Sequence, residues 1–146
     1  MIKPCTGLDP QKTAELAYEA ARGGVDIIKD DELVCDPPHC RLVDRVKAVV
    51  PAIKKADEEK GEKTLYAFNI TDRTEKLKSN AMTVIENGGN CLMVNYNTIG
   101  LDAARMLAKN RLFFPVFIMK TPPSIVKDYY EEAALGNRLP CGIPSV

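Results

Sequence analysis

Short apolar runs alternate along this chain with longer segments of helical periodicity, and this alternation limits the possible folds more than any other feature. The apolar runs span Val25 to Ile28, Leu65 to Ile70, Cys91 to Val94 and Phe113 to Met119. They are almost continuously apolar, as strands covered on both faces of a sheet are. The alternation therefore predicts a parallel β-sheet covered by helices.

The helical segments begin and end at recognisable signals. Asp9 and Pro10 predict the N-cap and first residue of a helix that runs to Arg22 and ends at Gly23. Four more helices are expected: one carrying Leu42 to Ile53 and ending at Gly61, one from Asp72 to Gly88, one from Gly100 to Lys109, and one from Ser124 to Leu135.

Composition narrows the classes of function. The 146 residues are enough for one domain, and 45% apolar with 27% charged residues is typical of soluble globular proteins. Twenty basic and twenty acidic residues balance, so we expect neither nucleic acid nor an anionic membrane as partner. No membrane-length apolar run or signal peptide is evident. Five cysteines without a CxxC pair predict a reduced, cytoplasmic protein without a disulfide framework or structural zinc site.

Two architectures fit a parallel sheet of this kind, the (β/α) barrel and the open doubly wound sheet. In both, ligands bind beyond the C-terminal ends of the strands. Polar residues follow four successive strand ends in this chain: Lys3, Lys29 to Glu32, Asn69 to Thr71, and Asn95 to Asn97. No glycine-rich phosphate loop follows the first strand, which disfavours a dinucleotide fold and favours the barrel.

The charged run Lys29-Asp30-Asp31-Glu32 is the most distinctive of these groups. Strand alternation places Lys29 and Asp31 on one face and Asp30 on the other. Asp31 and Glu32 would suit Mg²⁺, which prefers oxygen ligands, although an ammonium beside them would repel the ion. A lysine carbamate, formed from the neutral amine and CO2, would instead be an anionic oxygen ligand. The alternative is a solvated charge run in which Lys29 pairs with its own neighbours.

Four stretches carry a resemblance to a known family: IKPCTGLDP, GGVDIIKDDE, GEKTLYAFNIT and GGNCLMVNYNTIGLDA. In order and spacing they resemble the large-subunit barrel of RuBisCO and the RuBisCO-like proteins, over residues 1 to about 108. The resemblance implies an α/β fold, a partial (β/α)8 TIM-type barrel of about five β/α units. It further implies that Lys29 is carbamylated and binds Mg²⁺ together with Asp31 and Glu32.

The same resemblance implies a substrate and further site residues. Lys3 corresponds to a lysine that transfers protons during enolisation, and Asn69 to a polar residue near the metal. Lys3, Asn69 and Asn95 are therefore the expected substrate-binding residues. The substrate class is a phosphorylated sugar or sugar acid, which undergoes isomerisation, enolisation or decarboxylation.

Departures from the carboxylating enzymes favour a RuBisCO-like protein. Cys5 stands where carboxylating members have a second lysine, and Asn95 stands where they have an acid. The fifth strand ends near Phe117 to Met119, without the substrate-binding histidine expected there.

Residues 109–146 form an expected fifth strand and a divergent tail in which the resemblance is lost. A five-stranded barrel would leave an apolar inner face exposed at Val25, Ile27, Leu65, Ala67, Cys91 and Met93. We therefore expect a homo-oligomer and no turnover by this chain alone. The alternatives are a non-catalytic barrel fragment and a fragment of a true ribulose-bisphosphate carboxylase.

Overall fold

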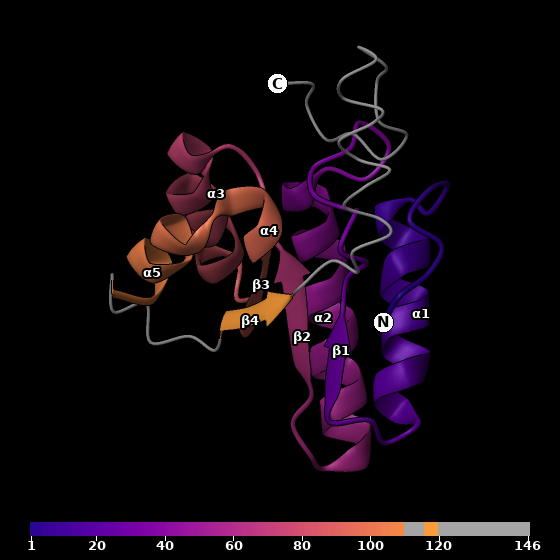
Figure 1. Cartoon of the computed structure of the whole chain (residues 1–146). Helices are drawn as coiled ribbons and strands as arrows, with labels where there is room; N and C mark the ends of the chain where they lie inside the picture. The colour runs from indigo at the N-terminus through magenta and orange to yellow at the C-terminus, as the bar shows by residue number, and fades with distance from the viewer. Residues whose placement is uncertain (110–115, 120–146) are drawn as a thin grey trace.

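The computed structural model describes residues 1–109 and 116–119 of the chain. Within them, strands and helices alternate (Figure 1). The strands are β1 (Ile27–Lys29), β2 (Leu65–Asn69), β3 (Cys91–Asn95) and β4 (Val116–Met119). The helices are α1 (Pro10–Arg22), α2 (Leu42–Lys60), α3 (Thr74–Glu86), α4 (Tyr96–Ile99) and α5 (Leu101–Lys109).

The four strands lie in chain order, β1-β2-β3-β4, and each is parallel to its neighbour. Parallel neighbours require a crossover between them, and α2, α3 and the α4–α5 pair provide these crossovers. The prediction of an α/β fold with parallel strands is confirmed. The described strands form an open sheet, so closure into a barrel stays a prediction.

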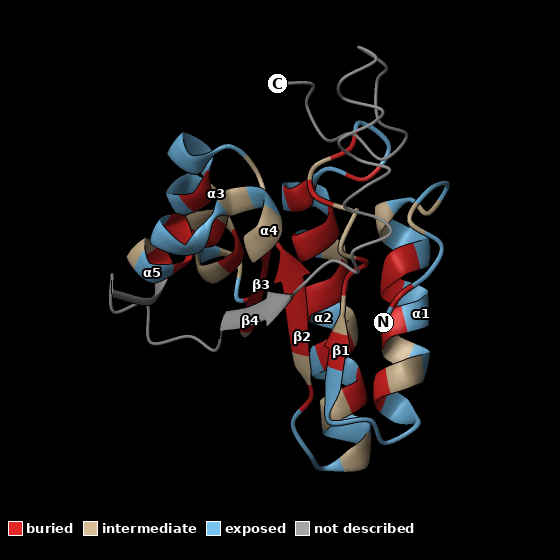
Figure 2. Ribbon diagram, in the orientation of Figure 1, coloured by how far each residue is buried: buried red, intermediate tan, exposed pale blue. Residues whose placement is uncertain are grey.

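Helices cover one face of this sheet, which we call the helix face. Its core combines residues of β1, β2 and β3 with the apolar stripes of α1, α2, α3 and α5, and the strand residues are Ile28, Tyr66, Phe68, Leu92 and Val94. Figure 2 shows the buried stripes of α1 and α2 turned toward β1 and β2. The opposite face of the sheet carries a smaller buried cluster of Ala67, Cys91 and Met93.

The opposite face is exposed only in part. Val25, just before the short strand β1, is 41% exposed, and Ile27, the first residue of β1, is 48% exposed. Ala67, Cys91 and Met93 are at most 1% exposed, so the expectation of a wholly exposed inner face is wrong for these residues.

Several element boundaries differ from those expected. No strand forms around Lys3; instead the Ile2 amide donates to the Lys29 carbonyl at 2.9 Å, which attaches the N-terminal segment to the end of β1. The helix expected from Gly100 is preceded by the short helix α4, and Gly100, at φ 79°, separates the two. Residues 113–115 and the helix expected over residues 124–135 lie outside the described residues.

The signals at the ends of α1 and α2 are confirmed. The Asp9 carboxylate accepts a hydrogen bond from the Lys12 amide at 2.7 Å, as an N-cap does, and Gly23 ends α1. Gly61 ends α2 in the left-handed conformation at φ 77°.

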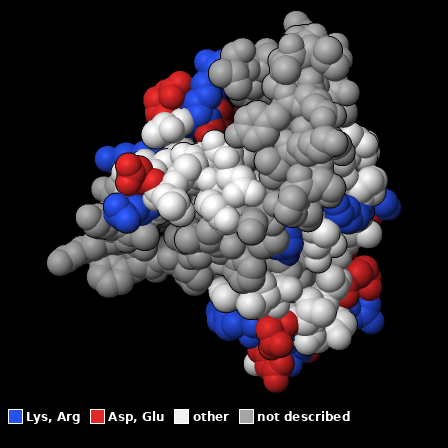
Figure 3. All heavy atoms as spheres, in the orientation of Figure 1, with Lys and Arg blue, Asp and Glu red and all other residues white. Residues whose placement is uncertain are grey.

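No helix within residues 1–109 is both long and apolar enough to span a bilayer. On the face drawn in Figure 3, acidic and basic side chains are intermixed and do not gather by sign.

Candidate functional site

Polar side chains stand at the C-terminal ends of three neighbouring strands. Lys29 ends β1, Asn69 ends β2 and Asn95 ends β3. Lys29 pairs in register with Ala67 and Asn69 with Met93, so these side chains share the face opposite the helices. The structure therefore places these polar residues, predicted from the sequence, side by side at the C-terminal ends of the strands.

Two lysines and two carboxylates meet at the end of β1. The Lys29 amine donates to the Glu32 carboxylate at 2.9 Å, and both side chains are largely buried. The Lys3 amine forms an ion pair with Asp31 Oδ2. The Asp31 side chain is fully buried, whereas that of Lys3 is 53% exposed. Lys3, Lys29, Asp31 and Glu32 thus form one charged group, although Lys3 approaches it from a segment without regular structure.

These contacts shift the ionisation of two members. The hydrogen bond with the Asp31 carboxylate raises the pKa of Lys3 above its ordinary value. Burial opposes ionisation of Glu32, but the hydrogen bonds from Lys29 and from its own backbone amide, together with the charges of Lys29 and Lys3, outweigh burial, and the pKa of Glu32 is lowered. The site without metal therefore holds charged, mutually paired lysines and acids.

The Asp31 carboxylate retains bonding capacity. Its Oδ1 accepts a hydrogen bond from the Leu33 amide at 2.8 Å. Among the described residues, Asp31 Oδ2 has no hydrogen-bond partner beyond the Lys3 ion pair. A buried carboxylate oxygen in this state costs free energy unless a cation faces it, and here that cation is Lys3.

Asn69 is wholly buried and holds the loop that carries the acids. Its side-chain nitrogen, Nδ2, donates to the backbone carbonyls of Asp31 and Glu32, at 3.1 and 2.9 Å. Its Oδ1 accepts from the amide and the hydroxyl of Thr71. These bonds occupy the Asn69 side chain, which therefore holds the backbone of Asp31 and Glu32 in place.

Asn95 and Thr71 connect the C-terminal ends of β3 and β2. The Asn95 amide donates to Thr71 Oγ1 at 2.9 Å, and the Asn95 carboxamide accepts from the Asn97 amide at 3.1 Å. Asn95 therefore caps the short helix α4.

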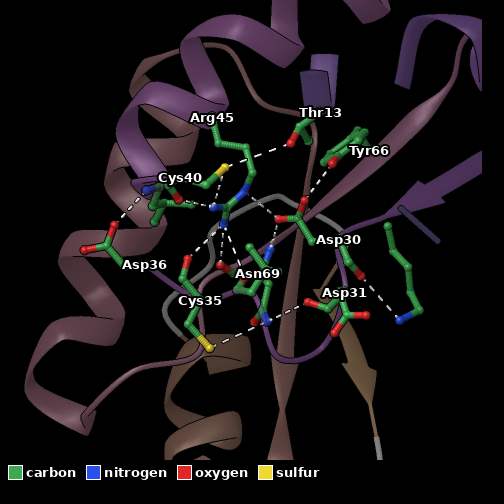
Figure 4. Close-up of polar contacts among 12 residues, drawn as sticks. Thr13, Asp30, Asp31, Cys35, Asp36, Cys40, Arg45, Tyr66 and Asn69 are labelled. Carbon is green, nitrogen blue, oxygen red and sulfur yellow. Dashed lines mark hydrogen bonds and ion pairs between the residues drawn. The ribbon is translucent and has the colours of Figure 1, made fainter. Parts of the chain in front are cut away.

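Asp30 points to the helix face, as strand alternation predicts, and lies between Arg45 and Tyr66 (Figure 4). Its Oδ2 accepts from Arg45 Nε at 3.0 Å and from the backbone amide of Asn69 at 2.8 Å. Its Oδ1 accepts from the Tyr66 hydroxyl at 2.6 Å. Burial and the Asp30 charge together raise the pKa of Tyr66 well above 10. Asp30 is therefore satisfied by protein groups.

Sequence reasoning missed Arg45 and Tyr66. Arg45 is completely buried, although it lies on α2 three residues after Leu42 and four before Val49. That spacing puts a cation inside an apolar stripe, which is the signal that could have identified it. An arginine in such a position requires a buried acid, and Asp30 is that acid.

Cys5 and His39, two other reactive side chains, differ in exposure. Cys5 is half-buried and lines a small cavity together with Asp31, Cys40 and Arg45. His39 is exposed in the loop between β1 and α2.

The donor set fits a hard divalent cation if Lys29 contributes an oxygen. The described residues contain no group of three His, Cys, Asp or Glu side chains that could hold a metal ion. Asp31 and Glu32 provide two carboxylates, one of them with a buried oxygen that only a cation faces. A carbamate on Lys29, whose amine already lies against Glu32, would provide the third anionic oxygen ligand that Mg²⁺ favours.

Comparison with known proteins gives a consistent result. Residues 1–114 match the family model described as ribulose bisphosphate carboxylase large chain, catalytic domain. A ribulose bisphosphate carboxylase-like protein of Archaeoglobus fulgidus is 53% identical over 110 residues, which are 75% of this chain and 25% of the relative. The 3-oxo-isoapionate-4-phosphate decarboxylase of Rhizobium rhizogenes is 41% identical over 111 residues, 75% of this chain and 26% of that protein.

Solved structures agree with these relatives. A rubisco-like protein from Burkholderia fungorum matches with a TM-score of 0.75 and 34% identity, over 86% of this chain and 30% of that one. An octameric ribulose-1,5-bisphosphate carboxylase/oxygenase from Pyrococcus horikoshii matches with a TM-score of 0.75 and 28% identity, over 80% of this chain and 29% of that one. The chain spans about a quarter of the length of the curated relatives it matches.

Proposed function

The chain belongs to the family of the ribulose bisphosphate carboxylase large chain, catalytic domain, and we propose that it supplies the metal-binding part of a RuBisCO-like enzyme. The proposed chemistry is Mg²⁺-dependent enolisation of a phosphorylated sugar or sugar acid, leading to isomerisation or decarboxylation. In the complete domain the four described strands would belong to a (β/α)8 barrel, in which active sites lie at the C-terminal strand ends. The observation that carries the proposal is the meeting of two lysines and two carboxylates at that end of β1.

Lys29, Asp31 and Glu32 are the proposed metal ligands. The neutral Lys29 amine would add to CO2 and release one proton, which leaves a carbamate. Carbamylation would remove the positive charge that now pairs with Glu32, and a divalent cation held by both anions would take its place. When bound, Mg²⁺ would supply a Lewis acid that polarises the substrate carbonyl.

The charge balance of the site supports this exchange. Without metal, the ammonium groups of Lys3 and Lys29 cancel the carboxylates of Asp31 and Glu32. Carbamylation turns one positive charge into a negative one, and a divalent cation restores the balance. Because Asp31 is fully buried and Glu32 largely so, a site that stays neutral avoids an uncompensated buried charge.

Lys3 is the proposed proton-transfer residue. It is now held in its charged form by Asp31. If Asp31 turned to a metal ion, Lys3 would lose this partner and lie near a cation, and both changes lower the pKa of an amine. A lysine whose pKa falls toward neutrality can accept a proton from the carbon next to a carbonyl.

The proposed reaction does not include CO2 fixation. Cys5 and Asn95 offer no charge at two positions where carboxylating relatives carry one. The relative from Rhizobium rhizogenes is a decarboxylase by name, which is in keeping with this chemistry. A complete domain with these residues is expected to exchange the proton next to a ketose carbonyl without fixing labelled CO2 on ribulose bisphosphate. Asn95 would face the substrate there, and Asn69 would act through the loop it holds.

Mg²⁺ titration calorimetry on the 146-residue chain tests the metal site. We expect binding in bicarbonate buffer and none in CO2-free buffer. Lys29→Arg keeps the positive charge but cannot form a carbamate, so it should abolish binding in both buffers. Lys76→Arg, the same change at an exposed lysine paired with Asp72, should leave binding unchanged. Equal affinity of the parent in the two buffers would contradict the carbamate.

A further inference from the structure

We propose that Arg45 is a positioning residue: through Asp30 and the backbone of the loop between β1 and α2, it fixes the direction in which Lys29, Asp31 and Glu32 point. We call residues 30–41 the β1–α2 loop. The functional consequence rests on the proposed metal site, whereas the effect on loop geometry does not.

Arg45 contacts both ends of the β1–α2 loop at once. At the start of the loop, its Nε donates to Asp30 Oδ2 at 3.0 Å. In the middle of the loop, its Nη2 donates to the Cys35 carbonyl at 2.9 Å, and near the far end its Nη1 donates to the Cys40 carbonyl at 2.8 Å. Nη2 also lies 3.4 Å from the carbonyls of Val34 and Asn69. One planar group thus holds the two ends of the loop and the end of β2 at fixed separations.

Asp30 transmits this constraint to the site. At a strand end, neighbouring side chains point to opposite faces. With Asp30 held on the helix face by Arg45, Tyr66 and the Asn69 amide, Lys29 and Asp31 must point to the other face. A carboxylate at position 30 that was free to rotate would remove this restriction and would compete for a cation.

The network is better explained by geometry than by stability. Burying an ion pair is often no more stabilising than filling the same space with apolar side chains. Here the three nitrogens of one fully buried guanidinium donate to a carboxylate and to backbone carbonyls that all belong to the loop or to the neighbouring strand end. A lysine could keep the charge, but its donors are all on one nitrogen, and it could not reach Asp30, Cys35 and Cys40 together.

Hydrogen exchange on the metal-free 146-residue chain tests the positioning role without depending on Mg²⁺. The reporters are the amides of Leu33 and Val34, which donate within the loop to Asp31, and the Asn69 amide, which donates to Asp30. In Arg45→Lys we expect these amides to exchange at least about tenfold faster, while amides of α3 keep their parent rates. Asp30→Asn should give the same pattern, and the double variant should add little to either change because both act in one network.

A matched control separates positioning from general destabilisation. Leu77→Ala removes a fully buried side chain of α3 and should accelerate exchange in α3 without a selective effect on the loop. If Arg45→Lys and Leu77→Ala accelerate exchange in the same uniform way, Arg45 only stabilises the fold and the proposal is wrong. Tyr66→Phe, which removes one bond to Asp30 and nothing else, serves if Arg45→Lys does not fold; it should accelerate the same loop amides about threefold or more.

Mg²⁺ titration then measures the functional consequence. In bicarbonate, Arg45→Lys should weaken binding by about ten- to a hundredfold, as loss of an outer-sphere contact does at other metal sites, whereas Leu77→Ala should not. A parent chain that does not bind Mg²⁺ would overturn the proposed function, and the exchange pattern would still decide the role of Arg45. An Arg45→Lys chain with a loosened loop and parent Mg²⁺ affinity would overturn the link between loop geometry and metal binding.

Discussion

The side-chain amide of Asn69 donates to the backbone carbonyl of Glu32 at 2.9 Å, so the end of β2 directly supports a proposed metal ligand on the loop after β1. The same amide reaches the Asp31 carbonyl at 3.1 Å. Both proposed carboxylate ligands therefore have their backbone held by one buried side chain. A contact of this kind fixes the position of a ligand without touching the metal.

Asn69→Ala should loosen this support. We expect a loss of about 1–3 kcal/mol in the free energy of unfolding, because two backbone carbonyls lose a buried donor. Mg²⁺ affinity in bicarbonate should fall by about tenfold or more. Chemical denaturation and calorimetry measure the two effects. Asn80→Ala is the control, since its amide makes only 3.4 Å contacts; an equal loss of affinity there would argue against a specific role for Asn69.

The pairing of Lys29 with Glu32 predicts a pH dependence. The pKa of Glu32 is lowered in the folded chain, so its contribution to stability is present above its ordinary value of 4.5 and disappears as pH falls through the folded value. Lys29→Met removes the donor. The parent should exceed this variant in urea midpoint near pH 7, by a difference of about 1 kcal/mol or less in free energy, and the difference should shrink in acid.

Lys76→Met provides the comparison for that experiment. Lys76 pairs with Asp72 at 3.7 Å and is 58% exposed, so its removal should have almost no effect at any pH. A difference between parent and Lys29→Met that stays constant from pH 7 to acid would contradict the assigned cause.

Gly89 is required by close packing two residues before β3, the strand that ends in Asn95. A Cβ there would overlap Val84 Cγ1 and lie 3.0 Å from the Val84 carbonyl and 3.2 Å from the Phe68 ring. Gly89→Ala should therefore cost about 3 kcal/mol, at the upper end of the usual cost of overpacking. Gly61→Ala meets no atom within 4 Å and has only its φ of 77° against it, so it should cost about 1 kcal/mol. Similar urea midpoints for the two variants would show that the backbone at Gly89 can move.

Much of the fold follows from the sequence because periodicity and capping are local signals. The apolar runs locate β2 and β3 to within one residue, and Asp9, Gly23 and Gly61 set the limits of α1 and α2. The segment around Lys3 was misjudged because a strand needs a partner, and here the backbone makes one bond to the end of β1. Gly100 was expected to begin a helix, but at a φ of 79° it separates two.

The site could be predicted only in outline. Alternation along β1 separates Asp30 from Lys29 and Asp31, and this prediction is confirmed by the contacts of Asp30 on the helix face. The partnership of Asp30 with Arg45 joins positions 15 apart, and no local pattern specifies it. The engagement of Asn69 with the loop was likewise not predictable, since an asparagine at a strand end can face a ligand, water or the backbone.

The exposed edge of the sheet predicts self-association of this chain. Among the described strands, β1 pairs only with β2, and Ile27 on it is 48% exposed. An open edge with apolar side chains favours pairing with another chain, and joining two such edges would form a symmetric dimer. Light scattering should therefore show a dimer or larger species. Ile27→Lys places a charge on this edge and should shift the chain toward the monomer. Leu16→Lys, which changes an exposed apolar residue of α1, should not. A parent that is monomeric across the concentration range, or an Ile27→Lys variant as associated as the parent, would show that β1 is not the edge that pairs.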